Sequence, residues 1–230
     1  VRACESGRMK QHPIGMTVPY PNGNNADLFA SPADWISPNH TETEPYRTDP
    51  PAADGRKVIV ADTDHLWGHG GEQAWVWKSF ARGLNLLLMD PWEPLKGSDL
   101  QTNNFRDHPV WEPVRRSIGY ARRVAAGFDF ASMVPSPVSS TGYCLAAPGT
   151  ACIVYQPRPA AFIVDLTDWN GAFSVRWFDP AHGRMLEAEP RQGGAPCVFT
   201  PPCTPDSVLL LKKKESAGNF LARPPVKQMK

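Results

Sequence analysis

The spacing of apolar residues changes once along the chain, near residue 139, and this change restricts the possible folds more than any other feature. Up to about residue 128, stretches with strand character alternate with stretches of helical periodicity, a pattern typical of parallel β/α units. From residue 139 onward, short strands are separated by turns rich in glycine, proline and aspartate, which is typical of an antiparallel sandwich. The sequence therefore predicts an α/β part followed by an all-β part.

The first part, residues 1–128, is predicted to be the C-terminal portion of a (β/α)8 TIM barrel. The predicted strands are 12–18, 57–61 and 84–89, and the predicted helices are 31–36, 72–82 and 111–126, after a helix end at the start of the chain. The helix at 31–36 is inferred from Ser31 as its cap and Pro32 at its first position. Strand 84–89 is apolar enough to be buried on both faces. Three such units do not close an eight-stranded barrel, so we expect a larger (β/α) domain.

The second part, residues 139–216, is predicted to be an antiparallel β-sandwich. Its predicted strands are 140–146, 151–156, 160–166, 172–178, 183–189, 195–200 and 207–213. The connector at 129–138 is apolar rather than rich in glycine and serine. Because a flexible tether would be polar, we expect Phe128, Phe130 and Met133 to hold the two parts in a fixed arrangement. Residues 217–230 have no periodicity and are predicted to be disordered.

Charge and composition argue against two classes of partner. The chain has 24 basic and 23 acidic residues, a formal net charge of +1, so we expect no nucleic-acid partner, and Lys212–Lys214 is interpreted as a solvated strand end. No apolar run approaches the ~20 residues that would span a membrane, so we expect no membrane partner. The five cysteines have no CxxC spacing. They are interpreted as buried thiols, or as a disulfide in a secreted protein.

Polar and aromatic residues follow each predicted strand of the first part, where functional residues of a parallel barrel lie. These candidate site residues are Tyr20 and Asn22 after the first strand, Asp62, Asp64, His65, Trp67 and His69 after the second, and Asp90 and Trp92 after the third. Strand parity places Val58, Val60, Asp62 and Asp64 on one face. Carboxylates and exposed indole rings at one edge favour glycoside hydrolysis, which needs two carboxyl groups.

Several of these residues also have a structural interpretation. Asp62 or Asp64 can cap a turn or pair with an arginine. His65 and His69 have a His-x3-His spacing, but the glycines around them disfavour a helix that would align them on a metal. Hydrogen bonding to substrate or to a carboxylate is therefore the preferred role, and we expect no metal and no cofactor. Trp75 and Trp77 are interpreted as helix packing.

Three runs of the first part resemble one family. KQHPIGMTVPYPNGNNADLFASPADWISP, KVIVADTDHLWGHGGEQAWVWKSFARGLNLLLMDPW and WEPVRRSIGYARRVA are similar to the C-terminal part of apiosidase-like (β/α)8 glycoside hydrolase domains. STGYCLAAPGTACIVYQP and VRWFDPAHGR resemble the β-sandwich that follows these barrels, which is described as a collagen-binding domain of a collagenase. The resemblance extends from about residue 8 to residue 212.

The resemblance implies that residues 10–128 carry the last three barrel strands. It also implies a nucleophilic carboxylate near the end of the seventh strand, 57–62, where Asp64 or Asp62 stands in place of the glutamate of the family. The acid/base partner is expected on the fourth strand, outside this chain, so we expect the chain alone to be inactive. The predicted function is that of a fragment of a secreted or periplasmic glycoside hydrolase that cleaves polysaccharide side chains. The alternative is a non-catalytic protein that binds collagen or carbohydrate.

Overall fold

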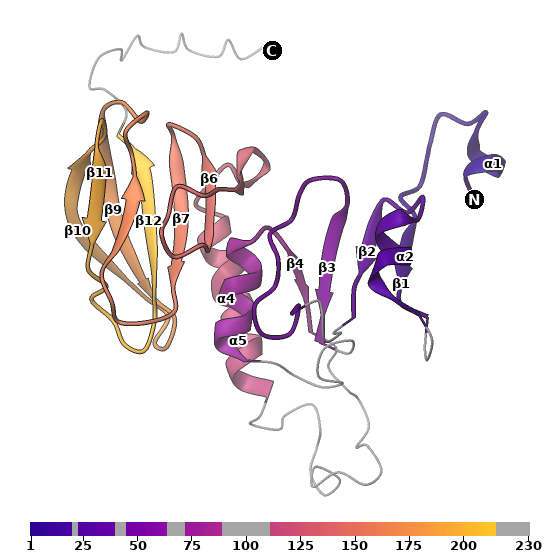
Figure 1. The fold of residues 1–230 in the computed structure, drawn as a ribbon, viewed down its shortest axis with the longest axis horizontal. Helices are drawn as coiled ribbons and strands as arrows, with labels where there is room; N and C mark the ends of the chain where they lie inside the picture. Colours follow the sequence, from indigo (N-terminus) through magenta and orange to yellow (C-terminus); the bar gives the residue numbers. More distant parts are fainter. Residues whose placement is uncertain (20–22, 40–44, 64–71, 89–110, 215–230) are drawn as a thin grey trace, which may run out of the picture.

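The computed structural model describes residues 1–19, 23–39, 45–63, 72–88 and 111–214. It is built in layers that succeed one another along the long axis of the molecule (Figure 1). A four-stranded parallel sheet lies at one side, two helices come next, and an antiparallel sandwich lies at the other side. The predicted succession of an α/β part and an all-β part is therefore confirmed.

The parallel sheet has the strand order β1-β2-β3-β4. Its strands are β1 (Gly15–Thr17), β2 (Trp35–Ser37), β3 (Val58–Asp62) and β4 (Asn85–Leu87), and each neighbouring pair is parallel. Three of them fall in the predicted strands. Sequential parallel pairing with a helix between strands is the arrangement found in β/α units.

Strand β2 corrects the prediction of a helix at residues 31–36. The helix in this region is α2 (Asn25–Ala30), which begins after Asn24, whose side chain accepts a hydrogen bond from the Asp27 amide. Ser31 is the C-cap of this helix, not the N-cap of the next one. The following residues pair with both β1 and β3, so tertiary pairing overrides the local capping signal. The chain therefore contributes four parallel strands, where three were expected.

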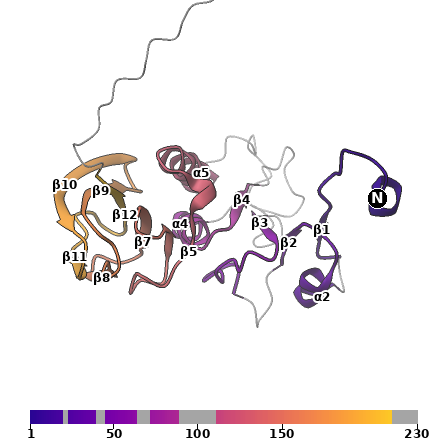
Figure 2. The ribbon, with the colours of Figure 1, turned by 90° about the horizontal axis from the view of Figure 1, so that it is seen from above.

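The other α-helices whose bounds fall within the described residues lie where the sequence predicts them. They are α1 (Arg2–Glu5), α4 (Gln73–Ala81) and α5 (Glu112–Ala125). In α4, Trp75 and Trp77 are buried, which confirms that they serve in packing. In α5 the buried side chains are Val114, Ser117, Ala121 and Val124. Seen from above, α4 and α5 lie between the parallel sheet and the antiparallel sheet (Figure 2).

The second part is a sandwich of a six-stranded and a two-stranded antiparallel sheet. The strands are β5 (Val134–Pro135), β6 (Cys144–Ala147), β7 (Ala151–Gln156), β8 (Phe162–Asp165), β9 (Ala172–Asp179), β10 (Arg184–Gln192), β11 (Pro196–Phe199) and β12 (Ser207–Lys213). The larger sheet has the order β10-β9-β12-β7-β6-β5, and β8 pairs with β11. All seven predicted strands are present, and β5 adds a short strand inside the predicted connector.

The six-stranded sheet is covered on both faces. Toward β8 and β11, alternate residues of β9, Phe173, Val175 and Trp177, enter one apolar core. Toward the helices, a second core collects side chains of β6, β7, β9 and β12 together with those of α4, α5 and the parallel sheet: Leu145, Ile153, Tyr155, Phe178, Val208, Leu210, Trp77, Phe80, Val124 and Ile59. Because this second core spans the two parts, they form one packed body.

The turn between β9 and β10 fixes the sandwich against α5. The Tyr120 ring lies over Gly183, so closely that a Cβ at this glycine would stand 2.4 Å from a ring carbon. The Arg123 guanidinium donates to the Gly183 carbonyl at 2.9 Å. Asp179 accepts from the Arg184 guanidinium and the His182 ring. Burial raises the pKa of the Asp179 carboxyl, but these hydrogen bonds outweigh it and hold the pKa below its usual value.

The predicted connector also packs against both parts. Met133 is buried, and the Phe130 ring stacks on Phe80 of α4 with centroids 5.4 Å apart, although Phe130 is still 40% exposed. Phe128 is partly buried, and the Lys212 ammonium lies 5.1 Å from the centroid of its ring. Lys212 also donates to the Gly127 carbonyl. Lys212–Lys214 is exposed, as predicted, yet its first residue joins the two parts.

Two further predictions concern the cysteines and the tail. All five cysteines are free thiols; Cys144, Cys152 and Cys203 are buried, and Cys4 is exposed. The tail at 217–230 lies outside the described residues. No helix in the described part of the chain is long and apolar enough to cross a membrane.

Candidate functional site

In the part of the chain that the structure describes, the face of the parallel sheet that points away from α4 and α5 is hollow and open. A cavity of about 790 Å³ lies on it, lined by Pro13, Thr17, Asp34, Trp35, Ser37, Val58, Val60, Asp62, Asn85 and Leu87. Its lining includes large apolar side chains with high exposure: Val58 at 53%, Leu87 at 44% and Trp35 at 37%. Parallel sheets normally have both of their faces covered by other elements. We call this surface the open face.

Strand β3 divides its side chains between the open face and the helices. Ile59 and Ala61 are buried in the core shared with α4, whereas Val58, Val60 and Asp62 line the cavity. The predicted parity of the strand is therefore confirmed for these residues. Asp62 is the last residue of β3 and is 8% exposed, so its carboxyl group lies at the carboxyl end of the open face, close to the protein interior.

Two hydroxyl groups stand at the same end of the sheet as Asp62. Thr17 and Ser37 are register neighbours at the ends of β1 and β2. Ile36 pairs with Ile59, so Ser37 is level with Val60 and Asp62 is one side-chain layer further out. The carboxyl ends of three adjacent strands thus present two hydroxyls and a carboxylate toward one cavity, the position from which barrel enzymes act on their substrates.

Trp35 forms the opposite end of the open face. Its indole ring covers Gly15 of the neighbouring strand, where a Cβ would stand 1.9 Å from two ring carbons. Any side chain at residue 15 would therefore displace the ring. Sequence reasoning missed Trp35 because it placed this residue in a helix. The signal available was a glycine in strand β1, since a strand glycine marks a close approach of another group.

Strand β4 contributes two residues to the open face that the sequence pattern did not identify as site residues. Leu84, Leu86 and Leu88 pack against the core shared with the helices, whereas Asn85 and Leu87 line the cavity. The prediction that this strand is buried on both faces is therefore wrong for the chain as it stands. Asp90, a predicted site residue that follows this strand, lies outside the described residues.

The remaining predicted site residues also lie outside the described residues. They are Tyr20, Asn22, Asp64, His65, Trp67, His69 and Trp92. Of the predicted site, the structure thus places Asp62 alone, and the roles of the others stay predictions. Among the described residues, no group of three or more His, Cys, Asp or Glu side chains is arranged to hold a metal ion.

Comparison with known proteins agrees with this architecture. Residues 132–212 match the family described as "Putative collagen-binding domain of a collagenase". The fold is similar to the crystal structure of a glycoside hydrolase family 5 protein from Bacteroides vulgatus ATCC 8482, with a TM-score of 0.53 and 13% identity, over 70% of this chain and 42% of that chain. A second structure, titled "Glycoside hydrolase", has a TM-score of 0.51 and 13% identity, over 82% of this chain and 44% of that chain.

These matches establish the fold of the chain, but they do not establish the family to which the whole chain belongs. The parallel β/α part corresponds to a portion of a glycoside hydrolase barrel, and the antiparallel part follows it. The chain spans less than half the length of these two structures. Comparison with curated protein sequences finds no match. The resemblance to apiosidase-like domains in particular stays a prediction.

Proposed function

We propose that this chain is one part of a glycoside hydrolase that cleaves glycosidic bonds in polysaccharide side chains, in a secreted or periplasmic protein. The observation that carries the proposal is Asp62, a carboxylate at the carboxyl end of a parallel strand that lines the open face. The similarity of the fold to two glycoside hydrolase structures supports it. In this proposal further β/α units cover the open face and close the barrel.

The chemistry requires two carboxyl groups on opposite sides of the scissile bond. We assign one of them to the segment that begins with Asp62 and continues to Asp64. In a retaining mechanism this carboxylate attacks the anomeric carbon, while a second carboxylic acid protonates the leaving oxygen. We place this second group on a strand outside this chain. The chain alone is therefore expected to bind sugars without cleaving them.

Three aspartate substitutions in the complete protein that carries this chain test the proposal. Asp62→Asn or Asp64→Asn, whichever removes the nucleophile, is expected to lower kcat on the order of 10⁴-fold. The matched control is Asp54→Asn, because Asp54 precedes the same strand at its opposite end and pairs with Arg56 in solvent. If both Asp62→Asn and Asp64→Asn keep full activity on every glycan that the protein cleaves, the two aspartates are structural and the assignment is wrong.

A second candidate function is binding of collagen or glycan without catalysis. The match of residues 132–212 to the family named for collagen binding favours it. The test is binding of the whole chain to collagen and glycan arrays. Residues 130–216 alone are unsuitable, since removal of α4 and α5 would expose Tyr155, Phe178 and Leu210, which are buried against them. Collagen binding by this chain, together with an absence of hydrolytic activity in the complete protein that carries it, would favour this candidate over the first.

A further inference from the structure

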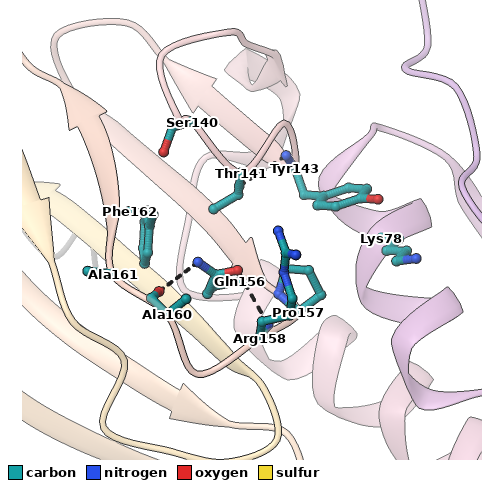
Figure 3. A pocket seen from close by; sticks show the side chains of 10 residues that line it. All are labelled: Lys78, Ser140, Thr141, Tyr143, Gln156, Pro157, Arg158, Ala160, Ala161 and Phe162. Atoms are coloured by element: carbon teal, nitrogen blue, oxygen red, sulfur yellow. Dashed lines mark hydrogen bonds between the residues drawn. The ribbon is translucent and has the colours of Figure 1, made fainter.

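A second cavity lies where the sandwich meets helix α4, away from the open face. Its volume is about 510 Å³, and it shares no lining residue with the cavity of the open face. It is lined by Lys78, Ser140, Thr141, Tyr143, Gln156, Pro157, Arg158, Ala160, Ala161 and Phe162 (Figure 3). We call it the junction pocket. Lys78 comes from α4 and the other residues come from the sandwich, so a ligand here would contact both parts.

Two cations and no carboxylate line the junction pocket. The Arg158 side chain extends from the turn after β7 into the pocket (Figure 3), and its guanidinium has no hydrogen-bond partner among the described residues. The Lys78 ammonium donates to the Thr48 carbonyl at 2.8 Å and lies 5.7 Å from the centroid of the Tyr143 ring. Lys78 has three N–H donors, so donors remain for a ligand. The lining therefore favours an anion.

The turn that carries Arg158 is held in place by Gln156. The Gln156 amide donates to the Ala160 carbonyl at 2.8 Å, and its oxygen accepts from the Arg158 backbone amide at 3.4 Å. Gln156 itself is 5% exposed, as the last residue of β7. The guanidinium therefore projects from an ordered backbone, which lowers the entropic cost of binding a ligand.

Tyr143 forms one wall of the pocket and stays neutral. Its hydroxyl donates to an Asp49 carboxylate oxygen at 2.5 Å, and the Arg82 guanidinium lies 4.6 Å from the ring centroid. Burial and the hydrogen bond to Asp49 raise the pKa of Tyr143 to about 12. Arg82 also lies 3.7 Å from Asp49. The charge of Asp49 is thus already compensated by Arg82 and the Tyr143 hydroxyl, which leaves Arg158 and Lys78 available to a ligand.

The rest of the lining is suited to hydroxyl groups and an apolar ring face. The Ser140 hydroxyl oxygen accepts from the Ile163 amide at 3.0 Å, and its hydrogen can still be donated. Thr141 also lines the pocket; its hydroxyl oxygen accepts from the Tyr143 amide at 3.2 Å and lies 3.2 Å from the Ser139 hydroxyl. The buried Phe162 ring supplies an apolar surface. Mixed apolar and hydroxyl linings around a few charged groups are usual in small-molecule sites of ~300–1,000 Å³. A pocket of this size holds one or two sugar residues more readily than the side of a collagen rod.

From these contacts we infer that the junction pocket binds an anionic sugar, a saccharide unit that carries a carboxylate or a sulfate group. Arg158 and Lys78 hold the anionic group, Ser140 and Thr141 hold hydroxyls, and Tyr143 and Phe162 pack against the ring. The site is independent of the proposed cleavage at Asp62, since it shares no residue with the open face. It would keep an acidic polysaccharide bound to the sandwich whether or not the barrel cleaves it.

The test is calorimetric titration of the whole chain with three sets of oligosaccharides: oligogalacturonate, sulfated oligosaccharides derived from heparin, and neutral dextran oligosaccharides. Binding of either anionic set, at least about tenfold tighter than the neutral set, is expected, and the preference between the two identifies the anionic group. Arg158→Gln is expected to weaken this binding about 10- to 100-fold, because a charge-assisted hydrogen bond is lost. Arg158 lies on an exposed turn, so the variant should fold, as its unfolding temperature will show.

The matched control is Arg191→Gln, because Arg191 is an exposed arginine on β10 that does not line the pocket. Its affinity should stay within about twofold of the unmodified chain, as expected for a surface site. Equal affinity for neutral and anionic sugars, or an unchanged affinity of Arg158→Gln, would overturn the inference. Binding of an acidic collagen peptide in the absence of any sugar binding would also overturn it. None of these outcomes depends on hydrolytic activity, so the result is distinguishable from a failure of the proposed cleavage.

Discussion

The two sheets of this molecule differ in how their faces are covered. The six-stranded antiparallel sheet has apolar cores on both sides, one against β8 and β11 and the other against helices α4 and α5. Among the described residues, the four-stranded parallel sheet has such a core on one side only, and its other side exposes Trp35, Val58 and Leu87. Parallel sheets are ordinarily buried on both faces and antiparallel sheets need not be. In the described part of this chain the antiparallel sheet is buried on both faces and the parallel sheet is exposed on one.

The difference identifies which surface is available for chemistry. The antiparallel sheet is part of the scaffold, since its central strands β7 and β12 bury nearly every side chain. The open face of the parallel sheet carries Asp62 and two hydroxyls toward a cavity. A cleft lined by strand ends over a rigid sheet is where a barrel enzyme places its substrate. Substitutions in the shared core and on the open face test this difference in burial between the two sheets.

The largest effect is expected from Phe178→Ala, which removes a ring shared by the two parts. Phe178 is 1% exposed, and its ring centroid lies 5.4 Å from those of Trp77 and Tyr120. The cavity left behind should lower the free energy of unfolding by about 3–5 kcal/mol, measured by urea denaturation of the whole chain. Val198→Thr, at a position that is 61% exposed, should change it by less than about 0.5 kcal/mol. Equal effects of the two substitutions would mean that the shared core contributes little.

A matched pair in the β4 region tests the open face directly. Leu84 is 4% exposed and packs toward the helices, whereas Leu87 is 44% exposed on the open face. In this chain, Leu84→Ala should cost about 2–5 kcal/mol of unfolding free energy and Leu87→Ala less than about 1 kcal/mol. Thermal unfolding of both variants provides the measurement. A cost at Leu87 as large as that at Leu84 would show that the open face is covered within the chain in solution.

A smaller effect, dependent on pH, is expected at Asp206, which links the two parts. This carboxylate is 4% exposed and accepts from the Tyr155 hydroxyl at 2.8 Å and from the Gln73 amide at 3.1 Å. Burial raises the pKa of Asp206, although these hydrogen bonds lower it in part. A carboxyl whose pKa is raised on folding stabilises the folded state below its ordinary pKa, and this contribution is lost as the pH rises through the folded pKa.

Asp206→Asn replaces the carboxyl group with an amide that does not ionise, so the stability that Asp206 loses at higher pH is not lost in the variant. The free energy of unfolding of the variant, relative to that of the unmodified chain, should therefore rise as the pH increases above the ordinary aspartate pKa of ~3.9. Urea denaturation at several pH values measures the difference. Asp165→Asn is the comparison of opposite sign: Asp165 is exposed and hydrogen bonds from Thr167 lower its pKa, so the corresponding difference should fall as the pH rises. A difference that stays constant with pH would contradict the burial of the Asp206 charge.

The smallest effect is expected from proteolysis of the folded chain, which should not cleave the connector. Met133 is buried and Val134 pairs with Ala146 of β6, so the backbone has no freedom to enter a protease. Chymotrypsin should leave residues 128–138 intact in buffer and cleave there in urea, as mass spectrometry of the fragments would show. Rapid cleavage between Gly127 and Ser139 in buffer, with release of two stable domains, would separate the two parts that we describe as one body.

Much of the fold could be predicted from the sequence because local patterns and tertiary pairing agree. The sandwich strands, helices α4 and α5, and the side of β3 that bears Asp62 all follow from periodicity. Strand β2 could not be predicted, since Ser31 and Pro32 resemble a helix start and only pairing with β1 and β3 makes Trp35–Ser37 a strand. A local signal is a weak guide where a short segment lies between two partners.

The cavities were less predictable than the strands. Strand parity was sufficient for Asp62, but Asn85 and Leu87 belong to the open face only because Leu84 and Leu86 face the helices, a choice that an entirely apolar run does not reveal. The junction pocket depends on contacts between distant segments, such as Tyr143 with Asp49. No spacing along the sequence indicates such a pair, so it becomes visible only in the folded structure.

The most direct test of the account is whether the open face is the inner wall of a closed barrel. Hydroxyl-radical footprinting of this chain and of the complete protein that carries it compares the oxidation rates of Trp35, Val58 and Leu87, which line the open face, with those of Ile163 and Val198. All five side chains are exposed in the structure. We predict that the first three are protected in the complete protein while the last two stay reactive. Equal oxidation of Trp35, Val58 and Leu87 in both proteins would contradict the claim that this face encloses an active site.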